Sequence, residues 1–162
     1  MTNDMTRHSA MHETFAIERK MRAPVSRVFA AWADAEAKRQ WFACHDEWVP
    51  IEYSLEFRIG GQERNRVADS DGVLHAYEAR YLDIVPQARI IYAYDMKLGE
   101  TRISASLATI TFEATPSGTT MLFTEQVVFL DDYTDGGSRR QGTEILVDRI
   151  QAFVERDGST AH

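Results

Sequence analysis

Glu125 is the residue whose setting most favours chemistry. It lies between Phe123 and Val127 in an alternating stretch, so these three side chains share one face of a strand. A carboxyl group on an apolar face is partly desolvated, and it can exchange a proton near neutral pH or accept a hydrogen bond from a ligand hydroxyl. Alternatively, the carboxylate is structural and is tied to Arg64, to Arg66 or to a tyrosine hydroxyl across the sheet.

His75 is the second candidate for a catalytic role. It alternates with Tyr77, Ala79 and Tyr81, so it shares their strand face. A histidine beside a glutamate and several phenols can form an acid–base set of the kind that guides aldol cyclisation. Equally, tyrosines line sheets because they combine apolar area with a polar tip, and His75 is then a wall or solvent-edge residue.

The consecutive residues Cys44, His45, Asp46 and Glu47 suggest a metal site or a thiol nucleophile. Adjacent loop residues do not readily all point at one ion, and a nucleophilic thiol needs an oriented partner. The alternative is a loop that lines a pocket mouth. We therefore predict no metal and no cofactor.

The candidate ligand-binding residues occupy apolar or inward positions of the expected helices and strands. Glu63 and Asn65 belong to this group if the strand register holds, because a one-residue slip reverses every face. The full set is Trp32, Trp41, Phe42, Trp48, Tyr53, Phe57, Glu63, Asn65, Tyr77, Tyr81, Tyr92, Tyr94, Phe123, Leu146 and Ile150.

Changes in hydrophobic period along the chain predict the elements that carry these residues. A strand begins at Glu13, and Pro24 then opens a helix whose apolar residues have helical spacing. A second short helix follows over residues 35–41. Alternating stretches predict strands over residues 49–57, 62–68, 74–85, 89–96, 103–114 and 119–130. A long amphipathic helix then begins at Ser138 and ends near Gly158.

This order predicts an α+β fold in which a curved antiparallel sheet of about six to seven strands surrounds the C-terminal helix. In the expected helix, Ile145, Leu146, Ile150, Phe153 and Val154 form the buried stripe. A helix laid on a strongly twisted sheet contacts only part of it. The remaining space predicts a ligand cavity.

Composition excludes several classes of partner. The chain has 162 residues, and its 18 Lys and Arg against 25 Asp and Glu give a formal charge of −7. An acidic chain with no basic run longer than Arg139-Arg140 is a poor partner for nucleic acid or for an anionic membrane. The longest apolar run, residues 28–33, is far shorter than the roughly 20 residues of a membrane span.

We expect residues 1–12 to be a loose tail, residues 13–157 to form one domain and residues 158–162 to be a second tail. The first residues lack the apolar stretch of a signal peptide, and the single cysteine permits no internal disulfide. A cytoplasmic location is therefore expected. A homodimer is possible, because the exposed edge strands of a curved sheet can pair with those of a second chain.

The order and spacing of several short motifs resemble the START-like (SRPBCC) superfamily. Within it, the chain is similar to bacterial relatives of the activator of the ninety-kilodalton heat-shock chaperone's ATPase. The supporting segments are residues 23–24, 28–32, 40–42, 57–61, 81–86, 124–126 and 142–143. The resemblance implies a helix-grip fold around a hydrophobic cavity. Many relatives carry an aromatic residue where this chain has Glu63, which implies an altered cavity wall.

The resemblance does not imply one reaction, because the superfamily includes lipid carriers, polyketide cyclases and a co-chaperone. The first interpretation is a protein that carries or sequesters a small hydrophobic or aromatic molecule. An alternative is a cyclase- or hydrolase-like enzyme that uses Glu125 with His75 or a tyrosine. The weakest is an adaptor acting on a chaperone, since the eukaryotic co-chaperone carries a further domain that 162 residues do not hold.

Overall fold

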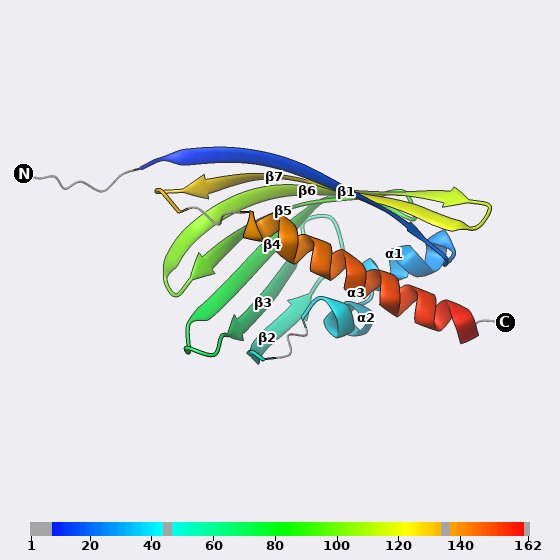
Figure 1. Ribbon diagram of the computed structural model, residues 1–162, viewed down its shortest axis with the longest axis horizontal. Helices are drawn as coiled ribbons and strands as arrows, with labels where there is room; N and C mark the ends of the chain where they lie inside the picture. Colours follow the sequence, from blue (N-terminus) through cyan, green and yellow to red (C-terminus); the bar gives the residue numbers. More distant parts are fainter. Residues whose placement is uncertain (1–7, 44–46, 134–136, 161–162) are drawn as a thin grey trace, which may run out of the picture.

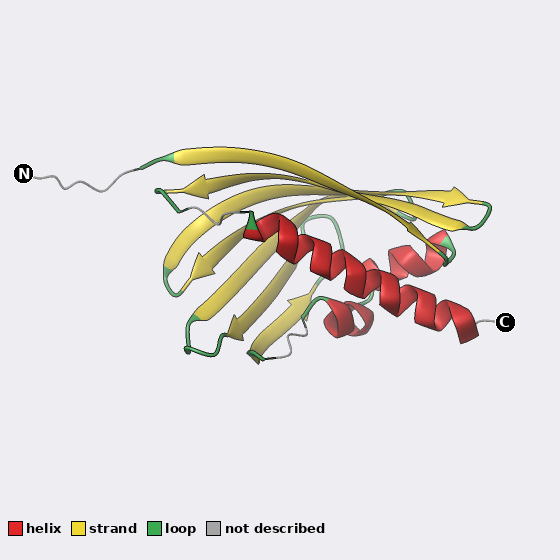
Figure 2. Cartoon of the chain, in the orientation of Figure 1, coloured by secondary structure: helices red, strands yellow, loops and turns green. Residues whose placement is uncertain are grey.

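Seven antiparallel strands form one curved sheet, and the three helices of the described residues lie on one side of it (Figures 1 and 2). The computed structural model describes residues 8–43, 47–133 and 137–160. The strand order is β1-β7-β6-β5-β4-β3-β2, so β1 and β2 are the two edges. The α+β helix-grip prediction is confirmed. The strands are β1 (Ala10–Met21), β2 (Val49–Leu55), β3 (Gln62–Ala68), β4 (Leu74–Val85), β5 (Arg89–Leu98), β6 (Thr101–Thr115) and β7 (Gly118–Leu130).

Two short helices join β1 to β2. Pro24 precedes α1 (Val25–Ala33), where its missing N–H costs nothing because the first helical N–H groups have no intrahelical partner. Asp34 ends α1 and begins α2 (Ala35–Trp41), and its carboxylate accepts a hydrogen bond from the Ala37 N–H at 3.0 Å. This cap turns the chain so that both helices place aromatic residues beneath the sheet.

Tight turns produce the meander from β2 to β7. Gly61 lies where the chain doubles back between β2 and β3, and a Cβ at this position would overlap the backbone oxygen of Glu56. Only glycine permits so close an approach. The Asp71-Gly72 turn between β3 and β4 uses the positive φ of Gly72, as the sequence predicts.

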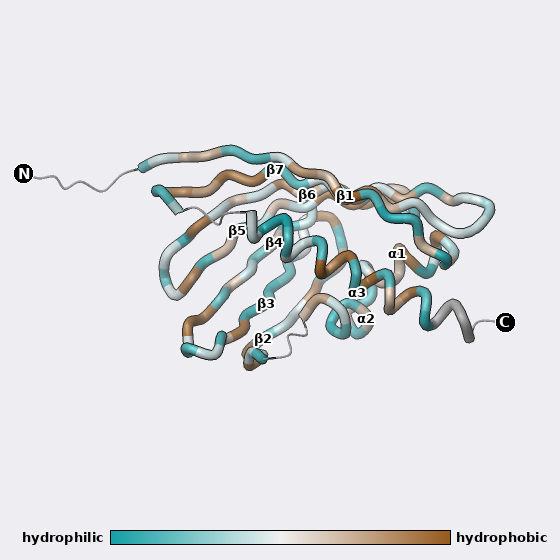
Figure 3. The backbone as a smooth tube through the Cα atoms, in the orientation of Figure 1, coloured by the Kyte–Doolittle hydropathy of each residue, from teal (hydrophilic) through white to brown (hydrophobic). Residues whose placement is uncertain are grey.

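The long helix α3 (Ser138–Thr160) crosses the concave side of the sheet, and its residues alternate between apolar and polar (Figure 3). Polar contacts attach one flank of α3 to the edge strand β1. Arg19 donates to Asp148 at 2.6 Å, and the Gln151 amide donates to the Lys20 carbonyl at 3.1 Å. The other flank faces the strands in the middle of the sheet, where it leaves space.

Some predicted boundaries and faces differ from the structure. β1 begins at Ala10 rather than Glu13, because residues 10–12 pair with the end of β7 although their side chains are exposed. β2 ends at Leu55, so Phe57 follows the strand, and α3 continues past Gly158. Ile145 was expected in the buried stripe but is 52% exposed, because the buried face passes instead through Thr143 and Val147.

Candidate functional site

A cavity of about 460 Å³ lies between α3 and the concave face of the sheet. Both layers contribute to its wall, together with α1, α2 and the chain that follows α2. Most of the wall is apolar or aromatic. Of the predicted site residues, those that line it are Trp32, Trp41, Phe42, Trp48, Asn65, His75, Tyr77, Tyr92, Tyr94, Phe123, Glu125, Leu146 and Ile150.

All three tryptophans of the chain line this cavity. Trp32 comes from α1 and Trp41 from α2, and their rings meet edge to face with centroids 4.8 Å apart. Trp32 also stacks on Phe123 of β7 at 6.3 Å. The cap at Asp34 fixes this arrangement, because it sets the angle between the two helices.

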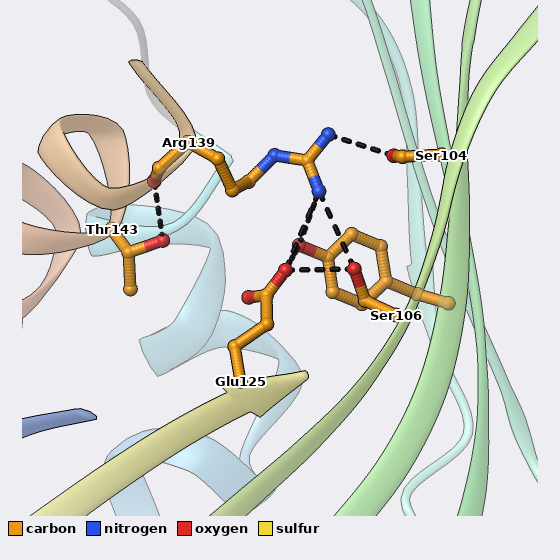
Figure 4. Close-up of polar contacts among 6 residues, drawn as sticks. Ser104, Ser106, Glu125, Arg139 and Thr143 are labelled. Carbon is orange, nitrogen blue, oxygen red and sulfur yellow. Dashed lines mark hydrogen bonds and ion pairs between the residues drawn. The ribbon is translucent and has the colours of Figure 1, made fainter. Parts of the chain in front are cut away.

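Glu125 is 1% exposed and lies within a buried polar cluster (Figure 4). The hydroxyls of Tyr94 and Ser106 each donate to its Oε2 atom at 2.7 Å. Arg139 approaches the same oxygen at 3.4 Å and donates to Ser104 at 2.7 Å. Burial, aided by the charge of Glu125, raises the pKa of Tyr94, so its phenol remains an O–H donor at neutral pH.

The sequence suggested a tyrosine, Arg64 or Arg66 as the partner of Glu125. The tyrosine partner is present, but the arginine that contacts Glu125 is neither Arg64 nor Arg66. The guanidinium comes from Arg139 in the first turn of α3. Arg139 had no assigned role, because only the folded arrangement of helix over sheet brings it to a carboxylate on β7. The signal available was its position, since a long side chain early in α3 can reach under the helix.

His75 also lines the cavity, but its partners differ from those of Glu125. Its Nε2 atom lies 2.9 Å from the Asp69 carboxylate, and its ring contacts Trp48 at 4.3 Å. Its strand, β4, is three positions from β7 in the sheet. Three strand spacings are about 14 Å, so Glu125 and His75 share a wall without forming one acid–base pair.

Four candidate wall residues, Tyr53, Phe57, Glu63 and Tyr81, do not line the cavity. Phe57 packs on Tyr81 with centroids 5.1 Å apart. The two tyrosine hydroxyls donate to Glu63 at 2.7 and 2.8 Å. Glu63 and Tyr81 face Lys38 of α2, whose ammonium donates to their side-chain oxygens at 2.8 and 3.3 Å.

Lys38 and Glu63 form an ion pair in which both side chains are completely buried, with the Lys38 Nζ 2.8 Å from Glu63 Oε1. Aromatic rings surround the ammonium, the closest being that of Phe42 at 4.4 Å. Burial lowers the pKa of Lys38, and the charge of Glu63 opposes that shift. Lys38 was missed, although its position three residues before Trp41 places it on the buried side of α2.

The loop that suggested a metal or nucleophile falls largely outside the described residues. Cys44, His45 and Asp46 are not described, whereas Glu47 is exposed. Among the described residues, no group of three or more His, Cys, Asp or Glu could hold a metal ion. Within the same residues, no helix is both long enough and apolar enough to span a membrane.

Comparisons with known proteins agree on one family. Residues 22–155 match the family described as Activator of Hsp90 ATPase homolog 1-like protein. An uncharacterized protein from Rhizobium leguminosarum is 66% identical over 93% of this chain and 99% of its own, with a TM-score of 0.91. A protein from Rhizobium loti is 36% identical over 90% of this chain and 99% of its own, with a TM-score of 0.84.

An AHSA1-like protein from Aeromonas hydrophila shares the fold at 16% identity, with a TM-score of 0.65 over 93% of this chain and 97% of its own. None of the curated proteins matches the chain.

Proposed function

The chain belongs to the family of Activator of Hsp90 ATPase homolog 1-like proteins, and we propose that it binds a small hydrophobic or aromatic molecule between α3 and the sheet. The fold of this family is a ligand-binding fold in general. In this proposal the protein carries or sequesters the molecule.

The single observation that carries the proposal is the cavity itself. Its volume of about 460 Å³ is in the usual range for small-molecule sites. Such sites are mainly apolar with a few fixed polar groups, and this wall combines three tryptophans with the cluster at Glu125.

Gly142 of α3 provides a second argument. A glycine inside a helix costs about 1 kcal/mol relative to alanine. Nothing lies within 4 Å of the position that a Cβ would take at Gly142, and this residue lines the cavity. The glycine is not required by packing within the protein, and it leaves α3 room for a molecule to approach its backbone.

Ligand binding can be tested through the tryptophans. We expect a panel of apolar and aromatic compounds to include members that raise the melting temperature and change the tryptophan fluorescence. Gly142→Leu adds a large side chain at a residue that lines the cavity, and we expect it to weaken this binding at least about tenfold by reducing the space for the ligand. Gln141→Leu is the matched control, because residues 141 and 142 are both exposed but only residue 142 lines the cavity.

The proposal fails if no compound shifts either signal. It also fails if both leucine variants bind as the wild type does, because binding would then take place outside the cavity.

Acid–base catalysis by Glu125 is a second candidate, favoured by the 2.7 Å contact of its carboxylate with the Tyr94 hydroxyl. Mass spectrometry of the bound compound after incubation separates the two functions. A carrier returns its ligand unchanged. An enzyme converts the ligand, and Glu125→Gln stops the conversion while binding persists.

A further inference from the structure

The two oxygens of the Glu125 carboxylate have different surroundings. Oε2 accepts from Tyr94 and Ser106 and lies near Arg139. Oε1 accepts no hydrogen bond from any residue that the structure describes, and in Figure 4 one carboxylate oxygen carries no dashed line. The cluster therefore satisfies one half of a buried carboxylate and leaves the other half open.

Oε1 retains contact with the cavity space. Among the described side chains that are not exposed, the fully enclosed nitrogen and oxygen atoms without a partner are Trp32 Nε1 and Arg66 Nε. Glu125 Oε1 has no partner among the described residues and yet is not among these enclosed atoms, so part of its surface remains accessible. Because Glu125 lines the cavity, that surface faces the cavity space. An acceptor in such a place costs free energy until a donor meets it.

The charges around the cavity indicate which donors fit. The guanidinium of Arg139 lies 3.4 Å from the Glu125 carboxylate and balances its charge. Because the charge of Glu125 is already balanced, an ammonium group would lose its hydration without a net negative partner. A carboxylate would bring a second negative oxygen against Oε1. A neutral hydroxyl meets neither penalty.

From these contacts, and resting on the proposed function, we infer that the cavity selects neutral hydroxylated aromatic or alicyclic molecules, with the ligand hydroxyl donating to Glu125 Oε1. The aromatic wall holds the ring system, and Glu125 of β7 accepts the hydrogen bond of the hydroxyl. An apolar cavity of about 150 Å³ admits benzene. One of about 460 Å³ therefore has room for a two-ring phenol.

Equilibrium dialysis at pH 7 with three probes of one ring system tests this selection. The probes are 2-naphthol, whose hydroxyl is protonated at this pH, 2-methylnaphthalene, which has no donor, and 2-naphthoate, which is an anion. We expect 2-naphthol to bind at least about tenfold more tightly than either of the others, the effect of one hydrogen bond to a charged group.

Glu125→Gln sharpens the test without altering side-chain shape. The donors around Oε2 hold the amide oxygen in that position and turn the amide NH₂ toward the cavity, replacing an acceptor by a donor. The advantage of 2-naphthol over 2-methylnaphthalene should then fall below about threefold. Gln126→Ala is the matched control, since Gln126 follows Glu125 on β7 but is exposed and does not line the cavity.

Equal affinity of the wild type for 2-naphthol and 2-methylnaphthalene would overturn the inference while leaving the proposed function intact. Tighter binding of 2-naphthoate would also overturn it, in favour of an anion held by arginine. Failure of all three probes to bind would count against the proposed function itself. These outcomes need only the wild-type protein, so they do not depend on the folding of a variant.

Discussion

Replacing Lys38 by methionine should destabilise the protein far more than replacing an exposed lysine or arginine. Both members of the Lys38–Glu63 pair are completely buried, at 2.8 Å. Removing one partner of such a pair leaves an uncompensated charge, which costs about 3–5 kcal/mol. For a chain of this size, 1 kcal/mol shifts the melting temperature by roughly 2–4 °C, so Lys38→Met should lower it by about 6–20 °C.

A double-mutant cycle separates the charge effect from lost packing. Lys38→Met with Glu63→Gln removes both charges, and Tyr53 and Tyr81 can still donate to the new amide oxygen. The double variant should therefore be more stable than Lys38→Met by about 2 kcal/mol.

Urea unfolding followed by tryptophan fluorescence and circular dichroism measures these free energies. Arg39→Met is the control on the same helix, because Arg39 pairs with Glu36 at 2.8 Å at an exposed site. Such pairs contribute about 0–1 kcal/mol. A free-energy cost of Lys38→Met no larger than that of Arg39→Met would contradict a strong buried ion pair. Additive effects of the changes at Lys38 and Glu63 would contradict it as well.

Three further predictions concern pH and helix stability. Five tyrosines are buried or largely buried and have raised pKa values, chiefly through desolvation, so their phenols ionise only in the unfolded chain. The free energy of unfolding should therefore fall as the pH rises above about 10, by up to about 1.4 kcal/mol per pH unit for each tyrosine. Absorbance at 295 nm should show these tyrosines ionising together with unfolding, and ionisation before unfolding would contradict this. The hydrogen bond from His75, with two backbone N–H donors, lowers the pKa of Asp69, so this stabilisation is present above its unfolded pKa and is lost as pH falls through the lower folded value; an NMR titration showing an ordinary Asp69 pKa would count against it. Gly142→Ala should stabilise the protein by about 1 kcal/mol in urea unfolding, and a loss of stability would show that the space beside α3 is smaller than described.

The sequence predicts strand boundaries best where a turn or a proline lies at each end of the strand. The β4 strand runs from the Asp71-Gly72 turn to Pro86, and its bounds agree with the prediction. β1 has no such signal at its beginning. Its first three residues are held only by backbone pairing with β7, which no local pattern reveals.

The candidate site shows a similar division. Alternation alone placed Glu125 on the inward face, because a strand has a fixed period of two. Its partner Arg139 comes from a different layer and could not be derived from any period. Lys38 was missed for another reason, since a lysine in a short helix ordinarily faces water. Only Glu63 on the facing strand makes its burial possible.

The expectations of a chaperone adaptor and of a homodimer remain predictions. Addition of the pure protein to a chaperone of the ninety-kilodalton class should change its ATPase rate if the adaptor hypothesis holds. The molar mass in solution, measured by light scattering, decides whether two chains associate. Either result is independent of the cavity.

A crystal structure of the protein with 2-naphthol would locate the ligand and its hydroxyl. We expect the ring system between α3 and the sheet, against Trp32 and Trp41, with the hydroxyl within hydrogen-bonding distance of Glu125 Oε1. A ligand bound on the outer surface, with the cavity unfilled, would contradict it.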